Sequence, residues 1–147
     1  MKRIARSAIV EHPAHALYAL VERVEDYPAF LPWCREAQVH ERSASRTRAT
    51  LVVGLKGLRY AFTTDNANQP PSAIDLRLAQ GPFRHFAAHW RFTPLGERAA
   101  RIDFAMEYEF AGRVISRALG PLFESIADTM VDAFKRRADE LHGQTAR

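Results

Sequence analysis

At 147 residues, with 47% hydrophobic and 26% charged side chains, the chain has the size and composition of one globular domain with a substantial core. No apolar run approaches the ~18 residues that a membrane span needs, and the single cysteine, Cys34, excludes an internal disulfide and fits a reducing cytoplasm. The formal net charge of +4 is mild and no basic run exceeds the triplet 135–137, which excludes a DNA-binding arm but allows contact with RNA or anionic lipid.

The first segments are predicted to be a strand and a short helix. Residues 2–10 alternate between apolar and polar side chains well enough for a first strand. Pro13 suits the first turn of a helix, whose buried stripe would be formed by the apolar residues between 17 and 24. His12 and His15 lie near the start of this helix, and we expect them on the surface rather than as metal ligands.

Residues 27–34, Tyr-Pro-Ala-Phe-Leu-Pro-Trp-Cys, form the least ordinary stretch of the chain. Two prolines four residues apart preclude a long regular helix, yet three aromatic rings and a leucine are crowded around them. The segment is therefore predicted to be a rigid loop. Its rings either pack against the sheet or form a mobile apolar gate, and the sequence leaves both alternatives open.

Six segments between residues 38 and 110 have the pattern of strands. They are residues 38–43, 47–55, 59–66, 74–78, 86–92 and 102–110, with glycine-, proline- or serine-containing turns between them. Strands joined by short turns predict an antiparallel sheet with one apolar face and one wet face. Glu107 and Glu109 alternate with large apolar residues, so we expect both carboxylates on the wet face.

The last helix is predicted over Leu119–His142, with an approach segment from Gly112, a kink or restart at Gly120-Pro121 and a stop at Gly143. Its apolar residues recur at steps of three and four and form one stripe. They are Leu119, Leu122, Phe123, Ile126, Met130, Val131, Phe134, Ala138 and Leu141. An α+β fold follows, in which a curved antiparallel sheet of about seven strands wraps around this helix. We expect one domain over residues 1–143 and a frayed tail at 144–147.

The sequence offers little for catalysis or metal binding. No nucleophile elbow or phosphate loop is present, and Cys34 has no identifiable partner histidine. His85 and His89 are four apart on a predicted strand, hence ~13 Å apart and too far to share one ion. We therefore expect a non-enzymatic protein without a metal. The apolar interior is either a close-packed core or a void for an apolar guest, with Tyr60, Thr64 and Asn66 placed to orient a head group.

Five segments resemble one protein family. They are residues 27–34, Phe62-Thr63-Thr64-Asp65-Asn66, Gly81-Pro82-Phe83, Trp90-Arg91-Phe92 and Met130-Val131-Asp132-Ala133-Phe134-Lys135-Arg136-Arg137-Ala138. Together they are similar to the coenzyme Q-binding, START-like proteins of the polyketide cyclase/lipid transport group, which also includes bacterial ribosome-association toxins. The resemblance spans Lys2 to Gly143 and implies the helix-grip (START/SRPBCC-like) fold.

The resemblance also implies a function and a site. It points to a long apolar tunnel for ubiquinone or a similar polyprenyl lipid, in a non-catalytic role that supports respiration and needs no other cofactor. The ligand-binding residues would be Tyr27, Phe30, Leu31 and Trp33 at the mouth and Tyr60, Phe62, Trp90, Leu119, Phe123 and Met130 inside.

Two other functions stay open as alternatives to the quinone carrier. The first is a toxin-like protein that binds the large ribosomal subunit and blocks subunit association, and the second is a polyketide cyclase or aromatase. The partners expected are a polyprenyl quinone or another apolar small molecule, a transient membrane contact, or the large ribosomal subunit, but not DNA. The expected location is the cytoplasm, or the periphery of the inner membrane.

Overall fold

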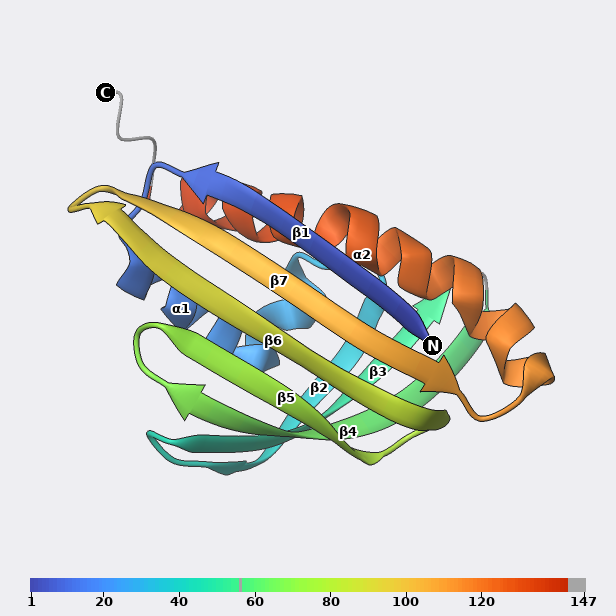
Figure 1. Cartoon of the computed structure of the whole chain (residues 1–147). Coiled ribbons are helices and arrows are strands. Elements are labelled where there is room, and N and C mark those ends of the chain that lie inside the picture. Colours follow the sequence, from blue (N-terminus) through green and yellow to red (C-terminus); the bar gives the residue numbers. More distant parts are fainter. Residues whose placement is uncertain (56, 143–147) are drawn as a thin grey trace.

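In a computed structural model that describes residues 1–55 and 57–142, a seven-stranded antiparallel sheet lies against one long C-terminal helix (Figure 1). The strand order is β1-β7-β6-β5-β4-β3-β2, so consecutive strands form hairpins and β1 is added beside β7. The elements are β1 (Lys2–Val10), α1 (Ala14–Glu22), the 3₁₀ helix η1 (Val24–Ala29), β2 (Cys34–Arg42), β3 (Arg46–Leu55), β4 (Leu58–Gln69), β5 (Ala73–Gln80), β6 (Phe83–Gly96), β7 (Ala99–Phe110) and α2 (Arg113–His142). This arrangement confirms the predicted helix-grip fold. The predicted stop at Gly143 and the tail 144–147 lie outside the described residues.

The alternation of side chains along the strands produces the two faces of the sheet. On β7, Ile102, Phe104, Met106, Tyr108 and Phe110 are buried, while the residues between them are partly or fully exposed. Antiparallel register aligns these buried positions with the buried positions of β6 and sets them toward α2. The carboxylates of residues 107 and 109 lie on the opposite face, 39% exposed, as predicted.

Helix α2 is longer than the sequence pattern predicted. It begins at Arg113 instead of Leu119 and continues through Pro121, so the predicted alternative of a restarted helix is wrong. A proline inside a helix removes one backbone hydrogen bond, and the apolar stripe on both sides of Pro121 keeps the helix on the sheet. That stripe is buried as predicted except at its end, where Leu141 is 52% exposed, and at Met130, which is half-buried. None of the helices described within residues 1–55 and 57–142 is long and apolar enough to cross a membrane.

Polar contacts tie α2 to the N-terminal part of the chain. Lys2 and Arg6 on β1 form ion pairs of 3.3 and 2.9 Å with Glu124 and Asp128 of α2. His12, which follows β1, is only 2% exposed, and its Nε2 lies 2.6 Å from a carboxylate oxygen of Asp139. The expectation that His12 lies on the surface is therefore wrong, because the turn from β1 into α1 carries its ring beneath the end of α2. His15 is exposed, as expected.

Candidate functional site: a groove beside the apolar interior

The segment predicted to form the mouth, residues 27–34, is folded tightly by hydrogen bonds. The Tyr27 hydroxyl donates to the carbonyl oxygen of Val21, and the amide of Leu31 donates to the carbonyl of Tyr27 at 2.9 Å. Tyr27 and Leu31 are 8% and 1% exposed, and burial raises the pKa of the Tyr27 hydroxyl far above its ordinary value. For these two side chains the structure supports packing rather than a mobile gate. Phe30 is half-buried at the surface of the same segment.

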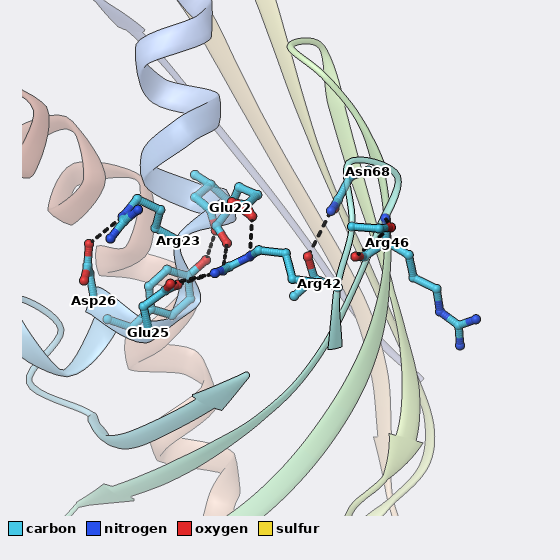
Figure 2. A network of polar contacts seen from close by, with 11 residues as sticks. Glu22, Arg23, Glu25, Asp26, Arg42, Arg46 and Asn68 are labelled. Carbon is cyan, nitrogen blue, oxygen red and sulfur yellow. Dashed lines mark hydrogen bonds and ion pairs between the residues drawn. The ribbon is translucent and has the colours of Figure 1, made fainter. Parts of the chain in front are cut away.

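An arginine on β2 anchors this segment from the other side (Figure 2). The two terminal nitrogens of Arg42 each donate to a carboxylate oxygen of Glu25 in η1 at 2.7 Å, and its Nε lies 2.8 Å from the carboxylate of Glu22 in α1. Hydrogen bonding to Arg42 lowers the pKa of Glu25 to about 2. Such a bidentate, charge-assisted contact has a defined geometry, so it fixes η1 and the following loop relative to the sheet.

Behind this loop, the side chains predicted to line the tunnel contact one another across the space between sheet and helix. Phe62 on β4 and Phe123 on α2 have ring centroids 6.2 Å apart. Trp90 on β6 and Phe134 on α2 are 5.3 Å apart in an edge-to-face arrangement. Leu119 is 1% exposed, while Tyr60 and Met130 are half-buried beside this core. An apolar guest between sheet and helix would have to part these rings.

Two residues that the sequence interpretation left out of the site connect its parts. Phe134 is fully buried and lies edge-on to Tyr27 at 5.4 Å and to Phe30 at 5.2 Å, besides its contact with Trp90. Phe83, which lies before the predicted strand 86–92, is part of β6 and has its ring centroid 5.2 Å from that of Phe123. The helical stripe contained a signal for Phe134, whereas the Gly81-Pro82 turn signal obscured Phe83.

A surface groove runs between the mouth segment and the side of α2. It encloses about 590 Å³, within the usual range of ligand sites. Its lining residues are Phe30, Pro32, Trp33, Leu122, Ser125, Thr129, Ala133, Arg136 and Glu140. Of the predicted mouth residues, Phe30 and Trp33 line the groove, whereas Tyr27 and Leu31 are buried in the core. The indole N–H of Trp33 is buried behind this wall and has no hydrogen-bond partner among the described residues.

The inner face of the sheet also carries a buried polar strip. Thr47, Thr64, Asn66 and Asn68 lie on neighbouring strands and are each at most 6% exposed. The Asn68 amide donates to the Thr47 hydroxyl at 3.0 Å, while the side-chain oxygen of Asn66 has no hydrogen-bond partner in the described part of the chain. Unpaired polar atoms are rare in protein interiors, and this one would accept a hydrogen bond from a donor placed there. Thr64 and Asn66 are thus within the interior as the head-group hypothesis requires, while Tyr60 is only half-buried.

A second hollow, of about 520 Å³, lies on the outer face of the sheet. Its lining includes the small residues Ala5, Ala87 and Ala105 together with charged side chains such as Arg3 and Arg77. This hollow lies on the face of the sheet turned away from α2. The groove beside Phe30 is therefore the better candidate for an entrance to the interior.

Neither the groove nor the interior presents a reactive centre. Within the described ranges, no group of three or more histidine, cysteine or acidic side chains is arranged to hold a metal ion. Cys34 is 3% exposed, and burial raises the pKa of its thiol to about 11, so the thiol stays protonated at neutral pH. The arrangement is suited to binding apolar groups.

Comparison with known proteins identifies the family of this chain. Residues 10–135 match the family described as polyketide cyclase / dehydrase and lipid transport, which is most of the chain. The chain belongs to this family. The match confirms the resemblance inferred from residues 27–34 and the other four segments.

Individual relatives differ in what their names state. Ribosome association toxin RatA from Pseudomonas aeruginosa is 45% identical over 140 residues, which cover 95% of this chain and 97% of that protein. Coenzyme Q-binding protein COQ10 homolog B, mitochondrial, from Xenopus laevis is 28% identical over 149 residues, covering 97% of this chain and 61% of that protein. The crystal structure of the Zhui aromatase/cyclase from Streptomyces has a TM-score of 0.80 at 16% identity, over 98% of this chain and 99% of that one. At this identity the likeness shows the fold alone.

Proposed function

We propose that this protein associates with the large ribosomal subunit and blocks its joining to the small subunit. The observation that carries the proposal is the 45% identity to Ribosome association toxin RatA, which extends over 95% of the chain. The quinone carrier, which the sequence interpretation placed first, is supported by a relative of only 28% identity. The order of the two hypotheses is therefore reversed.

The proposed role is association without catalysis. The RatA relatives are named for association with the ribosome, and the aromatase/cyclase neighbour, at 16% identity, shares the fold alone. The surface is rich in arginine, and guanidinium groups bind phosphate and carboxylate through paired hydrogen bonds. Such a surface suits contact with a ribonucleoprotein particle.

A subunit-joining assay tests this function. Purified small and large ribosomal subunits are mixed at a magnesium concentration that supports joining, with and without the protein, and separated on a sucrose gradient. We expect the peak of joined ribosomes to fall and the protein to migrate with the large subunit. An unchanged peak with the protein left at the top of the gradient would refute the proposal.

The groove supports a second candidate function, the binding of a ubiquinone-like lipid. The rings of Phe30 and Trp33 border the groove, and Phe134 connects this wall with the aromatic interior. Ligand sites typically combine an apolar wall with a few polar groups that orient the ligand, and here Ser125, Thr129, Arg136 and Glu140 accompany the apolar lining residues. The side chains of Ser125 and Arg136 in the groove lining are hydrogen-bond donors for the ring carbonyls of a quinone, whose tail would lie against the aromatic wall.

Lipid extraction tests this second function. Protein purified without detergent is extracted with organic solvent, and the bound quinone is quantified by mass spectrometry. We expect Thr129→Trp, which fills the groove, to lower the bound amount severalfold, and Asp132→Trp, at an exposed position of the same helix outside the groove, to leave it unchanged. Absence of quinone from the unsubstituted protein would reject the carrier function.

A further inference from the structure

The two ends of the molecule differ in charge. One end, here called the α2-start end, is formed by the first residues of β1, β2 and β4, the β5–β6 turn and the junction of β7 with α2 (Figure 1). Strand register places these segments along one edge of the sheet. Lys2 pairs with Tyr108 and Phe83 with Phe110, and the pairs Thr63–Gln80, Val53–Tyr60 and Cys34–Val53 continue this edge to β4, β3 and β2. The amide of Ala111 donates to the carbonyl of Pro82 at 3.0 Å, which joins two of the turns directly.

Positive charge is in excess at the α2-start end. Its described cationic residues are Lys2, Arg3, Arg35, Arg59, Arg84, Arg113 and Arg117, and its acidic residues are Glu36, Glu107, Glu109 and Glu124. This is a surplus of three positive charges, whereas the remaining described residues carry one more acidic than basic side chain. The basic character of the described chain is therefore localised at this end rather than spread over the surface.

Three arginines at this end have no carboxylate partner among the described residues. Lys2, Arg59 and Arg84 are in ion pairs with Glu124, Glu36 and Glu109, but the ion pairs of the described chain include none for Arg35, Arg113 or Arg117.

The positions of Arg113 and Arg117 are electrostatically unfavourable in the isolated protein. Arg113 and Arg117 are exposed and lie one turn apart at the start of α2, where like charges repel and the helix dipole disfavours cations. Val114, between them, is 80% exposed. No ion pair among the described residues neutralises Arg113 or Arg117, so a bound anion would lower the electrostatic free energy of both side chains.

We infer that the α2-start end contacts the phosphate backbone of ribosomal RNA, an inference that rests on the proposed ribosomal function. Arginine forks from two separate segments of the chain, the start of β2 and the start of α2, present several donors to an extended row of phosphates. A lipid surface would instead require a cluster of apolar side chains to insert among the head groups. At this end the exposed large apolar side chains are Met1, Leu58 and Val114, one from each of three segments and none aromatic, against seven cationic side chains.

The first test compares two arginine pairs in binding to purified large ribosomal subunits. Arg113→Gln/Arg117→Gln removes the pair at the α2-start end, and Arg77→Gln/Arg98→Gln removes two exposed arginines of β5 and the β6–β7 turn, which also have no ion pair among the described residues. We expect the first variant to bind at least about tenfold more weakly, with the slope of log affinity against log salt reduced by about 1.5, as for two lost phosphate contacts. The control should bind like the unsubstituted protein.

The second test identifies the molecule that this end contacts. Val114 is replaced by the photo-reactive residue p-benzoylphenylalanine, and Leu95, 51% exposed at the end of β6, serves as the matched control. After irradiation with large subunits, we expect nuclease-sensitive cross-links to RNA from position 114 and none from position 95. Cross-links from position 114 to ribosomal protein alone would overturn the inference.

The outcomes separate this inference from the function on which it rests. If the unsubstituted protein does not bind large subunits, the proposed function fails and the inference with it. If it binds, and the Arg113→Gln/Arg117→Gln variant binds equally well, only the inference is wrong. Sedimentation of the protein with phosphatidylglycerol vesicles but not with subunits would replace RNA by an anionic membrane.

Discussion

Truncation of Phe134 tests how closely the mouth segment is coupled to the interior. This side chain is fully buried and contacts the rings of Tyr27, Phe30 and Trp90 at centroid distances of 5.2 to 5.4 Å. Replacement of a buried phenylalanine by alanine typically costs about 3–5 kcal/mol, and the three edge-to-face contacts of Phe134 place it in the upper part of this range. We therefore expect Phe134→Ala to lower the free energy of unfolding by about 4–5 kcal/mol.

The assay is equilibrium unfolding in urea, followed by tryptophan fluorescence and circular dichroism. Phe134→Leu should lose roughly 1–2 kcal/mol, since it keeps most of the volume, and Val114→Ala at an exposed position of the same helix should change stability by less than about 0.5 kcal/mol. The slope of unfolding free energy against urea should stay the same for all three variants.

A small effect at this position would refute the reasoning. If Phe134→Ala loses less than about 2 kcal/mol while the urea slope is unchanged, the rings around it are not close-packed, and the interior contains space that the aromatic contacts do not reveal. A loss of the expected size would show that opening a path from the groove into the interior requires the displacement of packed rings.

Three further predictions concern single positions. Arg42→Met should destabilise the protein by roughly 1–2 kcal/mol, because it removes partly exposed charge-assisted hydrogen bonds. In the unsubstituted protein the pKa of Glu25 is about 2, below its ordinary value of 4.5. The ionised Glu25 therefore contributes its full stabilisation above pH 4.5, and this contribution is lost as the pH falls toward 2. Arg42→Met removes the cause of the low pKa, so its free energy of unfolding should fall less steeply with decreasing pH over this range. Cys34 should resist iodoacetamide at pH 8 in the native state and react once urea unfolds the protein, because burial raises the pKa of its thiol to about 11. Rapid labelling of the native protein would contradict the burial of this side chain. Gly81→Ala would place a new Cβ 2.7 Å from the Phe62 Cβ and should lower the melting temperature by several degrees, whereas an unchanged melting temperature would show that the β5–β6 turn yields easily.

The fold was predictable because its two periodic patterns are long. Alternation along residues 102–110 and the helical stripe from Leu119 onward identified the apolar face of the sheet and the helix that covers it. The short 3₁₀ helix η1 and the true start of α2 at Arg113 were missed, because brief or terminal turns depend on local packing. Burial of His12 was unpredictable for a different reason, since its partner Asp139 lies 127 residues away.

The candidate site was predictable as a set of residue types but not as an arrangement. The crowded prolines and aromatics of residues 27–34 indicated a special segment, and Phe30 and Trp33 do border a groove. Periodicity reports which way a side chain faces, not which ring it meets, so the central position of Phe134 became visible only in three dimensions. Which arginines form ion pairs, and that Arg113 and Arg117 form none among the described residues, likewise depends on the folded surface.

The addition of β1 beside β7 has a consequence for the order of assembly during synthesis. The partners of β1, from Ala100 on β7 to Asp128 on α2, are made roughly a hundred residues after it. Contacts between such distant segments close late and slow folding, whereas the β2–β7 hairpins form from neighbours. One wall of the groove is α2 itself, so the groove does not exist until the last segment has docked. A chain in which α2 has not yet been made and docked would therefore lack this binding surface.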